Sequence, residues 1–222
     1  MIERGDGVAA DVNAPAELPV PAVIQKAPGI MVQGRLVKSL VFSTDLAIIC
    51  HCDADAVLAV YPFMCQPAIT QALVAAAQRP VINGVGGSIT QGERCVTLAL
   101  HSEMQGVAGV VVNAGIPVDT VRDLAAHVNV PVIVTVYRAD EAAFAQIDAG
   151  VDMVNVAAGR ETAPVVAALR ARYPELPIIA TGGPTDASVE ETLRAGANAI
   201  SWTPPTAQEL ERAVMERVRN SQ

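Results

Sequence analysis

The clearest candidate for a binding function is a glycine turn late in the chain. The segment 177–205 begins with the apolar run 178–180, continues through Thr181, Gly182 and Gly183, and then enters a segment typical of a helix. Exposed backbone N–H groups at a helix N-terminus bind phosphate and other anions. We therefore expect Thr181, Gly182 and Gly183 to bind an anionic group, with a plain tight turn as the alternative.

Other polar side chains stand where apolar segments end, and these could orient a substrate. Asn113 follows three valines, and Asn155 lies between two valines. A buried amide costs free energy unless it is hydrogen-bonded, so each either bonds a loop carbonyl or contacts a ligand. Arg160 could supply a cation to an anionic ligand, with a solvated loop arginine as the alternative. The further substrate-binding candidates are Asn83, Gly86, Thr135, Tyr137 and Trp202.

Candidates for acid–base catalysis are few. Asp45 follows the end of a predicted strand and is the carboxylate that we expect to act as general base. Asn113 and Asn155 complete the predicted catalytic set. Lys38 and Glu93 are weaker candidates, because Lys38 begins its strand and Glu93 lies in the first turn of a predicted helix.

The segments that position these residues repeat along the chain. A proline followed by an apolar strand recurs at 79–82, 130–133 and 176–179, and a helix end running through glycine into a strand recurs at 105–110, 149–154 and 195–200. The repeats predict strands near 38–43, 57–61, 80–85, 109–113, 131–137, 153–158, 177–181 and 199–203. Eight strands alternating with helices predict an α/β fold, a (β/α)8 TIM barrel, with an open doubly wound sheet as the alternative. Active sites of such barrels lie at the C-terminal ends of the strands.

Three parts of the chain depart from this repeat. Residues 1–30 are rich in proline, alanine and acidic residues, which predicts a flexible N-terminal extension before a single barrel domain at 31–222. An arm that packs on the barrel is the alternative. The short interval 43–57 leaves no room for a full helix, so we expect an irregular first unit with another strand at 46–52. The helix predicted at 207–219 is amphipathic and would close the ring.

Composition limits the classes of partner. The chain has 222 residues, of which 51% are hydrophobic and 17% are charged, and its formal net charge is −8. This negative charge argues against nucleic acid and anionic membrane as partners. The polar, acidic N-terminus and the four cysteines predict a cytoplasmic protein with free thiols. We expect a small, anionic substrate and no metal site or cofactor, and homo-oligomerisation is compatible with the sequence.

The motif PIIATGG, followed by a helix and AGANAI, resembles the seventh and eighth strands of phosphate-binding (β/α)8 barrels. Of these barrels, the 2-keto-3-deoxy-6-phosphogluconate aldolase family is the most similar in the sequence of this motif and in chain length. The resemblance implies lyase or isomerase chemistry of aldolase or epimerase type on a phosphorylated or carboxylated compound.

The chain departs from that family at two positions that matter for chemistry. Those aldolases form a Schiff base on a lysine of the sixth strand, but the corresponding segment 153–157 has none, and the only lysines are Lys26 and Lys38. The family's eighth strand usually ends in Gly-Ser, whereas here Trp202 is followed by Thr203 and two prolines, which have no N–H to offer. We therefore expect chemistry that does not use a Schiff base. An FMN-binding oxidoreductase, a hydrolase and a non-catalytic ligand-binding barrel remain as alternatives.

Overall fold

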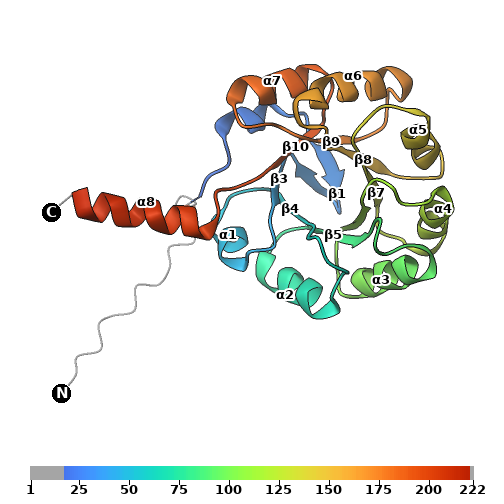
Figure 1. Cartoon of the computed structure of the whole chain (residues 1–222), viewed down its shortest axis with the longest axis horizontal. Coiled ribbons are helices and arrows are strands. Elements are labelled where there is room, and N and C mark those ends of the chain that lie inside the picture. The colour runs from blue at the N-terminus through green and yellow to red at the C-terminus, as the bar shows by residue number, and fades with distance from the viewer. Residues whose placement is uncertain (1–17, 221–222) are drawn as a thin grey trace.

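A computed structural model describes residues 18–220, and these form a closed parallel barrel surrounded by helices (Figure 1). Each strand pairs in parallel with its neighbours, and the last strand pairs with the first to close the ring. In order around the ring the strands are β3 (Ser39–Phe42), β4 (Ala56–Ala59), β5 (Val81–Gly86), β6 (Gly109–Val112), β7 (Val132–Val136), β8 (Met153–Val156), β9 (Ile178–Thr181) and β10 (Ala199–Trp202). The predicted TIM barrel is therefore confirmed.

Helices alternate with these strands, and all except the last one run along the outside of the ring (Figure 1). They are α1 (Leu46–His51), α2 (Pro67–Ala77), α3 (Gly92–Met104), α4 (Val118–His127), α5 (Glu141–Ile147), α6 (Thr162–Arg172), α7 (Asp186–Arg194) and α8 (Ala207–Asn220), with a short 3₁₀ helix, η2 (Gly159–Glu161), before α6. Among the helices of residues 18–220, none combines the length and the apolar composition that crossing a membrane would require.

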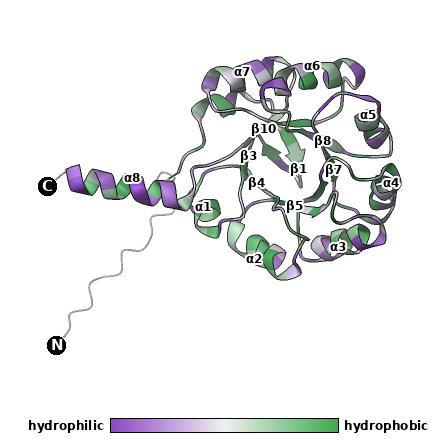
Figure 2. Cartoon of the chain, in the orientation of Figure 1, coloured by the Kyte–Doolittle hydropathy of each residue, from purple (hydrophilic) through white to green (hydrophobic). Residues whose placement is uncertain are grey.

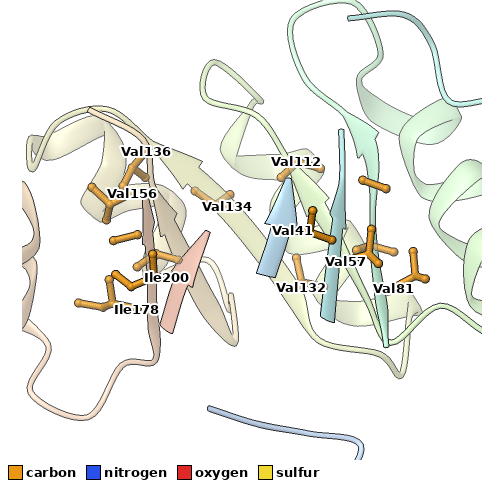
Figure 3. Packing of buried hydrophobic residues seen from close by; sticks show 14 of the residues in the cluster. Val41, Val57, Val81, Val112, Val132, Val134, Val136, Val156, Ile178 and Ile200 are labelled. Atoms are coloured by element: carbon orange, nitrogen blue, oxygen red, sulfur yellow. The ribbon is translucent and has the colours of Figure 1, made fainter. Parts of the chain in front are cut away.

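The strands bury both faces because their side chains alternate between two apolar layers. Val57, Val112 and Val134 belong to the layer between the strands and the helices (Figure 3). Leu58 and Ile133 belong to a second cluster inside the barrel. Strands that are buried on both sides are typical of parallel sheets covered by helices, and they explain the continuous apolar runs in the sequence.

A hairpin closes the bottom of the barrel, where the strands begin. β1 (Ile30–Val32) and β2 (Arg35–Val37) pair antiparallel, and the chain turns at Gln33 and Gly34, both with positive φ. This is the conformation of the commonest two-residue hairpin turn. Ile30, Val32 and Val37 are buried with the side chains inside the barrel. The barrel is therefore accessible from its C-terminal end.

Residues 18–30 pack against the barrel, so the predicted flexible extension is wrong for this part of the chain. The 3₁₀ helix η1 (Ala22–Lys26) lies beside α7, with Val23 and Ile24 buried. The N–H of Gly29 donates to the carbonyl of Asn198 at 2.8 Å. The apolar residues among the prolines are what anchor the segment. Residues 1–17 lie outside the described residues.

The segment 46–52 is mostly helical, so the predicted extra strand is wrong. α1 begins after Asp45, whose Oδ1 accepts from the N–H groups of Ala47 and Ile48. An aspartate N-cap stabilises a helix start by about 1 kcal/mol, and here it outweighs the β propensity of Ile48 and Ile49. The first βα unit is therefore short but regular.

The helix predicted at the C-terminus exists as α8, but it does not close the ring. Figure 1 shows α8 pointing away from the barrel, whereas α1 to α7 lie along it. The chain leaves β10 through Pro204 and Pro205. Each proline fixes its own φ and favours an extended conformation in the residue before it. The segment containing η1 occupies part of the space beside α7 that α8 would otherwise cover.

The repeated helix-to-strand phrase has a structural role at the bottom of the barrel. Asp152 accepts a hydrogen bond from the N–H of Val132 at 2.8 Å, and Asn198 accepts one from the N–H of Ile178 at 2.9 Å. At the matching position, Oδ2 of Asp55 accepts from the N–H groups of Lys38 and Ser39 and from the Ser39 hydroxyl, each at 2.9 Å. The repeat therefore marks side chains that tie the start of one strand to its neighbour.

Replacement of Asp55 should test this role. We expect Asp55→Ala to lower the free energy of unfolding by about 2–3 kcal/mol, because hydrogen bonds to charged groups contribute about 1.5–3 kcal/mol each and partly buried donors lose their acceptor. Urea unfolding followed by circular dichroism gives this value. Asp119→Ala, which removes an exposed carboxylate paired with Arg122, is the control and should change stability by less than about 0.5 kcal/mol. Equal effects of the two changes would contradict the role of Asp55.

Candidate functional site

The centre of the barrel mouth holds a polar pair whose hydrogen-bonding capacity is incomplete. Thr135 on β7 and Asn155 on β8 are register partners, each two residues beyond a side chain of the inner cluster. Nδ2 of Asn155 donates to Oγ1 of Thr135 at 3.2 Å, and Oδ1 of Asn155 is buried without a hydrogen-bond partner among residues 18–220. Reversing the amide would leave Nδ2 unpaired instead. Either way, one buried polar group can bind a ligand or an ordered water.

A small cavity opens at the mouth beside β4 and β5. Its volume is about 220 Å³, and it is lined by Tyr61, Cys65, Thr90 and Asn113 and by the glycine segment 84–87. β5 has a register irregularity between Gly84 and Gly86. A Cβ on Gly86 would collide with the Cys95 sulfur, so glycine is needed for close packing here. The cavity brings the predicted residues Gly86 and Asn113 together.

Tyr61 is the titratable group of this cavity best suited to donate a proton. Its hydroxyl oxygen accepts from the N–H of Gln66 at 2.7 Å, which leaves the hydroxyl proton for another partner. Burial raises the pKa of Tyr61 above its ordinary value, and the neighbouring Cys65 adds to the rise. The phenol therefore stays neutral at physiological pH and acts as a hydrogen-bond donor. Cys65 was not among the predicted site residues, whereas the place of Tyr61 just after β4 is the signal that identifies it from the sequence.

The neighbouring cysteines differ in their surroundings. The Cys65 sulfur lies 3.4 Å from Nδ2 of Asn83 and 3.6 Å from Oγ1 of Thr70. Burial raises the pKa of Cys95 to about 12, so this thiol is protonated at physiological pH and is not a nucleophile. Among residues 18–220, no three His, Cys, Asp or Glu side chains gather closely enough to hold a metal ion.

The side chain of Asn83 turns away from the mouth, so the structure does not support its predicted role in substrate binding. Its neighbour Ile82 belongs to the inner cluster, and the strand period of two turns Asn83 outward to the helices. There Nδ2 donates to Oγ1 of Thr70 and to Oγ of Ser102, both at 3.0 Å. Asn83 therefore links β5 to α2 and α3.

The predicted general base, Asp45, is an exposed helix cap. Both hydrogen bonds of its carboxylate to the start of α1 use Oδ1. Its other oxygen, Oδ2, makes no hydrogen bond to residues 18–220. Asp45 follows β3, so it lies on the face of the barrel where the mouth opens. Capping of α1 explains why an aspartate stands at position 45. A role as general base would use only Oδ2, because Oδ1 accepts the two hydrogen bonds of the cap.

Three predicted residues lie at or near the rim of the mouth. Tyr137, which follows β7, is 50% exposed. Arg160 follows β8 and is exposed within η2. Trp202, at the end of β10, is half-buried and lines a separate cavity of about 670 Å³ together with Thr181 and Gly182. The predicted residues thus divide between the centre of the mouth, the small cavity and this larger one.

The glycine turn of the larger cavity uses some of its N–H groups within the chain, whereas those of Gly183, Asp186 and Ala187 have no hydrogen-bond partner among residues 18–220. The N–H of Gly182 faces the carbonyl of Ser201 at 3.4 Å. The N–H groups of Thr185 and Ser188 are used in a reciprocal capping box between these two residues. Pro184 has no N–H, and Asp186 adds a negative charge to the first turn of α7. An anion here would therefore depend on the remaining N–H groups and would face the Asp186 carboxylate, so anion binding at this turn stays a prediction.

Close packing explains Gly182 itself. A Cβ at this position would lie 2.8 Å from methyl carbons of both Ile200 and Val189. Gly183 has φ +77°, a conformation that favours glycine. The two glycines are therefore required by the path of the chain between β9 and α7.

Comparison with known proteins supports the fold. A 4-hydroxy-tetrahydrodipicolinate synthase from Methylacidiphilum fumariolicum SolV matches with a TM-score of 0.61 and 12% identity over 76% of this chain and 68% of that protein. A 2,3-dimethylmalate lyase of the PEP mutase/isocitrate lyase superfamily matches with a TM-score of 0.59 and 14% identity over 90% and 84%. A dihydrodipicolinate synthase from Bacillus anthracis gives 0.59 and 13% over 74% and 69%.

The likeness is one of fold. At these identities the matches do not single out the 2-keto-3-deoxy-6-phosphogluconate aldolase family that the sequence resembles. No protein-family model matches the chain, and no curated protein matches it in sequence.

Substitution of Gly182 should show whether it serves packing. We expect Gly182→Ala to lower the free energy of unfolding by about 1–3 kcal/mol, because overpacking a well-packed region has this cost. Pro184→Ala, at the exposed neighbouring position, is the control and should have little effect. Both values come from urea unfolding. A stability unchanged in Gly182→Ala would mean that the glycine is not needed for packing and would restore the case for an anion site.

Proposed function

We propose that this protein is an enzyme of lyase or isomerase type that acts on a small carboxylated compound at the mouth of the barrel, without a Schiff base. The main support for this proposal is the Thr135–Asn155 pair, which places a buried polar group without a hydrogen-bond partner among aliphatic side chains. An unsatisfied buried group costs about 1–3 kcal/mol. A ligand that bonds Asn155 recovers this cost. Asn83 also has a buried amide oxygen without a partner, so it is the position of Asn155 near the C-terminal end of β8 that favours a binding role over a purely structural one.

The surroundings of this pair favour an anionic ligand. Arg138 follows β7 and Arg160 follows β8, so the two strands that carry Thr135 and Asn155 both lead into exposed arginines. Arginine binds carboxylates through paired N–H groups. The cavity of about 220 Å³ at the ends of β4, β5 and β6 is smaller than typical ligand pockets, which favours a compact carboxylate over a phosphorylated sugar.

Lyase and isomerase reactions of this kind begin by removing a proton from a carbon beside a carbonyl or carboxylate group. In the proposal, Oδ2 of Asp45 takes the proton, and the neutral Tyr61 hydroxyl donates a hydrogen bond to the oxygen on which negative charge develops. Asn113 and Asn155 orient the substrate. Each of these residues stands at or just beyond the C-terminal end of a barrel strand.

The absence of lysine from the mouth excludes imine chemistry. The chain has only Lys26 and Lys38. Lys26 pairs with Glu190 on α7, and Nζ of Lys38 donates to the carbonyl of Gln25. Both are therefore engaged outside the barrel mouth.

Reduction with borohydride should show that the protein forms no imine with a carbonyl compound. We expect no covalent adduct when the parent protein is reduced with borohydride in the presence of pyruvate, as measured by intact-mass spectrometry. Asn155→Lys is the matched positive control, because it places an amine on the sixth barrel strand, where burial lowers the pKa of lysine and favours the reactive neutral form. A pyruvate adduct on the parent protein would contradict the proposed mechanism.

A ligand screen should test the binding site. Small 2-oxo and 2-hydroxy carboxylates, phosphorylated sugars, inorganic phosphate and FMN would be compared for their effect on thermal unfolding. We expect a small carboxylate to stabilise the parent, since a ligand at 100 times its dissociation constant contributes roughly 2.7 kcal/mol. Asn155→Leu should lose this stabilisation, whereas Asn129→Leu, the same change at an exposed position, should retain it. A binding carboxylate should also exchange hydrogen for deuterium in D₂O, and Tyr61→Phe should slow this exchange.

The outcomes separate the alternatives. A phosphorylated sugar as the best ligand would overturn the substrate class, and bound FMN would indicate an oxidoreductase. Binding of a carboxylate without exchange would indicate a non-catalytic barrel. If no carboxylate stabilises the parent more than Asn155→Leu, the proposed site is wrong.

A further inference from the structure

Helix α8 has an apolar face that lacks a partner within the described chain. Val214, Met215 and Val218 are 47%, 47% and 49% exposed. Leu210, Val214 and Val218 follow the helical spacing of one face, and Figure 2 shows hydrophobic and hydrophilic residues alternating along α8. A protruding helix of 14 residues with such a face is a marginal structure in water on its own. Contiguous exposed apolar residues of this kind mark an interaction surface.

The same face borders a groove. A cavity of about 550 Å³ lies between α8 and α1 and is lined by Leu18, Ala47, Ile48, His51, Ala207, Leu210, Ala213 and Val214. One wall of this groove therefore comes from α8 itself, and most of its lining is apolar. A helix laid in the groove would contact α1 on one side and the apolar face of α8 on the other.

We propose that two copies of this chain form a two-fold dimer in which the α8 helix of each copy packs into the groove between α8 and α1 of the other. A two-fold interface requires one surface to be complementary to itself. The groove meets this condition because the helix that would fill it carries the same apolar residues that line it. Each copy then both offers a helix and receives one.

Charge and size agree with an antiparallel pairing of the two helices. The first half of α8 carries Glu209, Glu211 and Arg212, a net charge of −1, and the second half carries Glu216, Arg217 and Arg219, a net charge of +1. An antiparallel pair brings the acidic half of one helix beside the basic end of the other, which favours the correct orientation. A helix of 14 residues is about 21 Å long. Stable interfaces usually bury about 1,600 Å² in total, so the dimer needs the two grooves as well as the two helices.

The linker before α8 also favours exchange between copies. Pro204 and Pro205 hold the chain extended as it leaves β10, and the start of α8, at Leu210, packs against its own barrel while Val214, Met215 and Val218 stay exposed. Elements that cannot pack on their own chain reach the same kind of site on another copy at little cost. Residues 1–17 are the competing occupant, since Leu18 lines the groove. Their composition is more polar than the exposed face of α8.

Measurement of the molar mass tests the proposal. Sedimentation velocity of the full chain at micromolar concentration should give twice the chain mass of 23.0 kDa. The double variant Val214→Glu, Val218→Glu should sediment as a monomer, with its circular dichroism retained except for the signal of α8. Glu216→Gln, on the polar side of the helix, is the control and should remain a dimer. Deletion of residues 1–17 should also leave the dimer intact.

A crosslink gives an independent readout that does not depend on the double variant folding. Val214 lies at the middle of α8, so an antiparallel pair places the two copies of residue 214 side by side. Val214→Cys in a Cys50→Ser background should form an interchain disulfide under mild oxidation, whereas Gln208→Cys in the same background should not. A monomeric parent, a dimer that persists in the double variant, or a dimer lost on deletion of residues 1–17 would each overturn the proposal.

Discussion

Every strand of the barrel buries both of its faces, and this constraint determines where polar chemistry can occur. One face of each strand packs inside the barrel and the other packs against the helices. A polar side chain within a strand must therefore find a partner in one of two apolar layers, as Asn83 does among α2 and α3. Only the last residues of the strands can present polar groups to a ligand. Thr135 and Asn155 occupy such positions, and Tyr61 and Asn113 lie just beyond theirs.

The sequence allowed the fold to be predicted because the same physical requirement repeats. Each barrel strand reads as an apolar run, and the acidic or amide side chain in the helix-to-strand phrase ties neighbouring strands together. Because the pattern repeats, a strand that is hard to recognise in one unit can be placed by comparison with the other units. The predictions were wrong where the repeat is weakest. These places are the segment 46–52, where one N-cap decided the conformation, and the segments before the first and after the last barrel strand.

The candidate site was less predictable because its features depend on side-chain direction. Asn83 and Asn155 are both amides in apolar strands, and a register difference of one residue sends one to the helices and the other into the mouth. Glycine is ambiguous for a related reason. Gly182 suggested an anion site, but the nearby methyl groups of Ile200 and Val189 require a residue without a Cβ. Such distinctions depend on distances between segments far apart in the chain.

The ring of helices is incomplete at one place, and that place adjoins the mouth. The cavity of about 670 Å³ between η1, α7 and the start of α8 is lined by Thr181 and Trp202 on one side and by Pro205 and Glu209 on the other. The residues that end β9 and β10 therefore border both the mouth and the base of the protruding helix. A partner that holds α8 in position would restrict the movement of this wall.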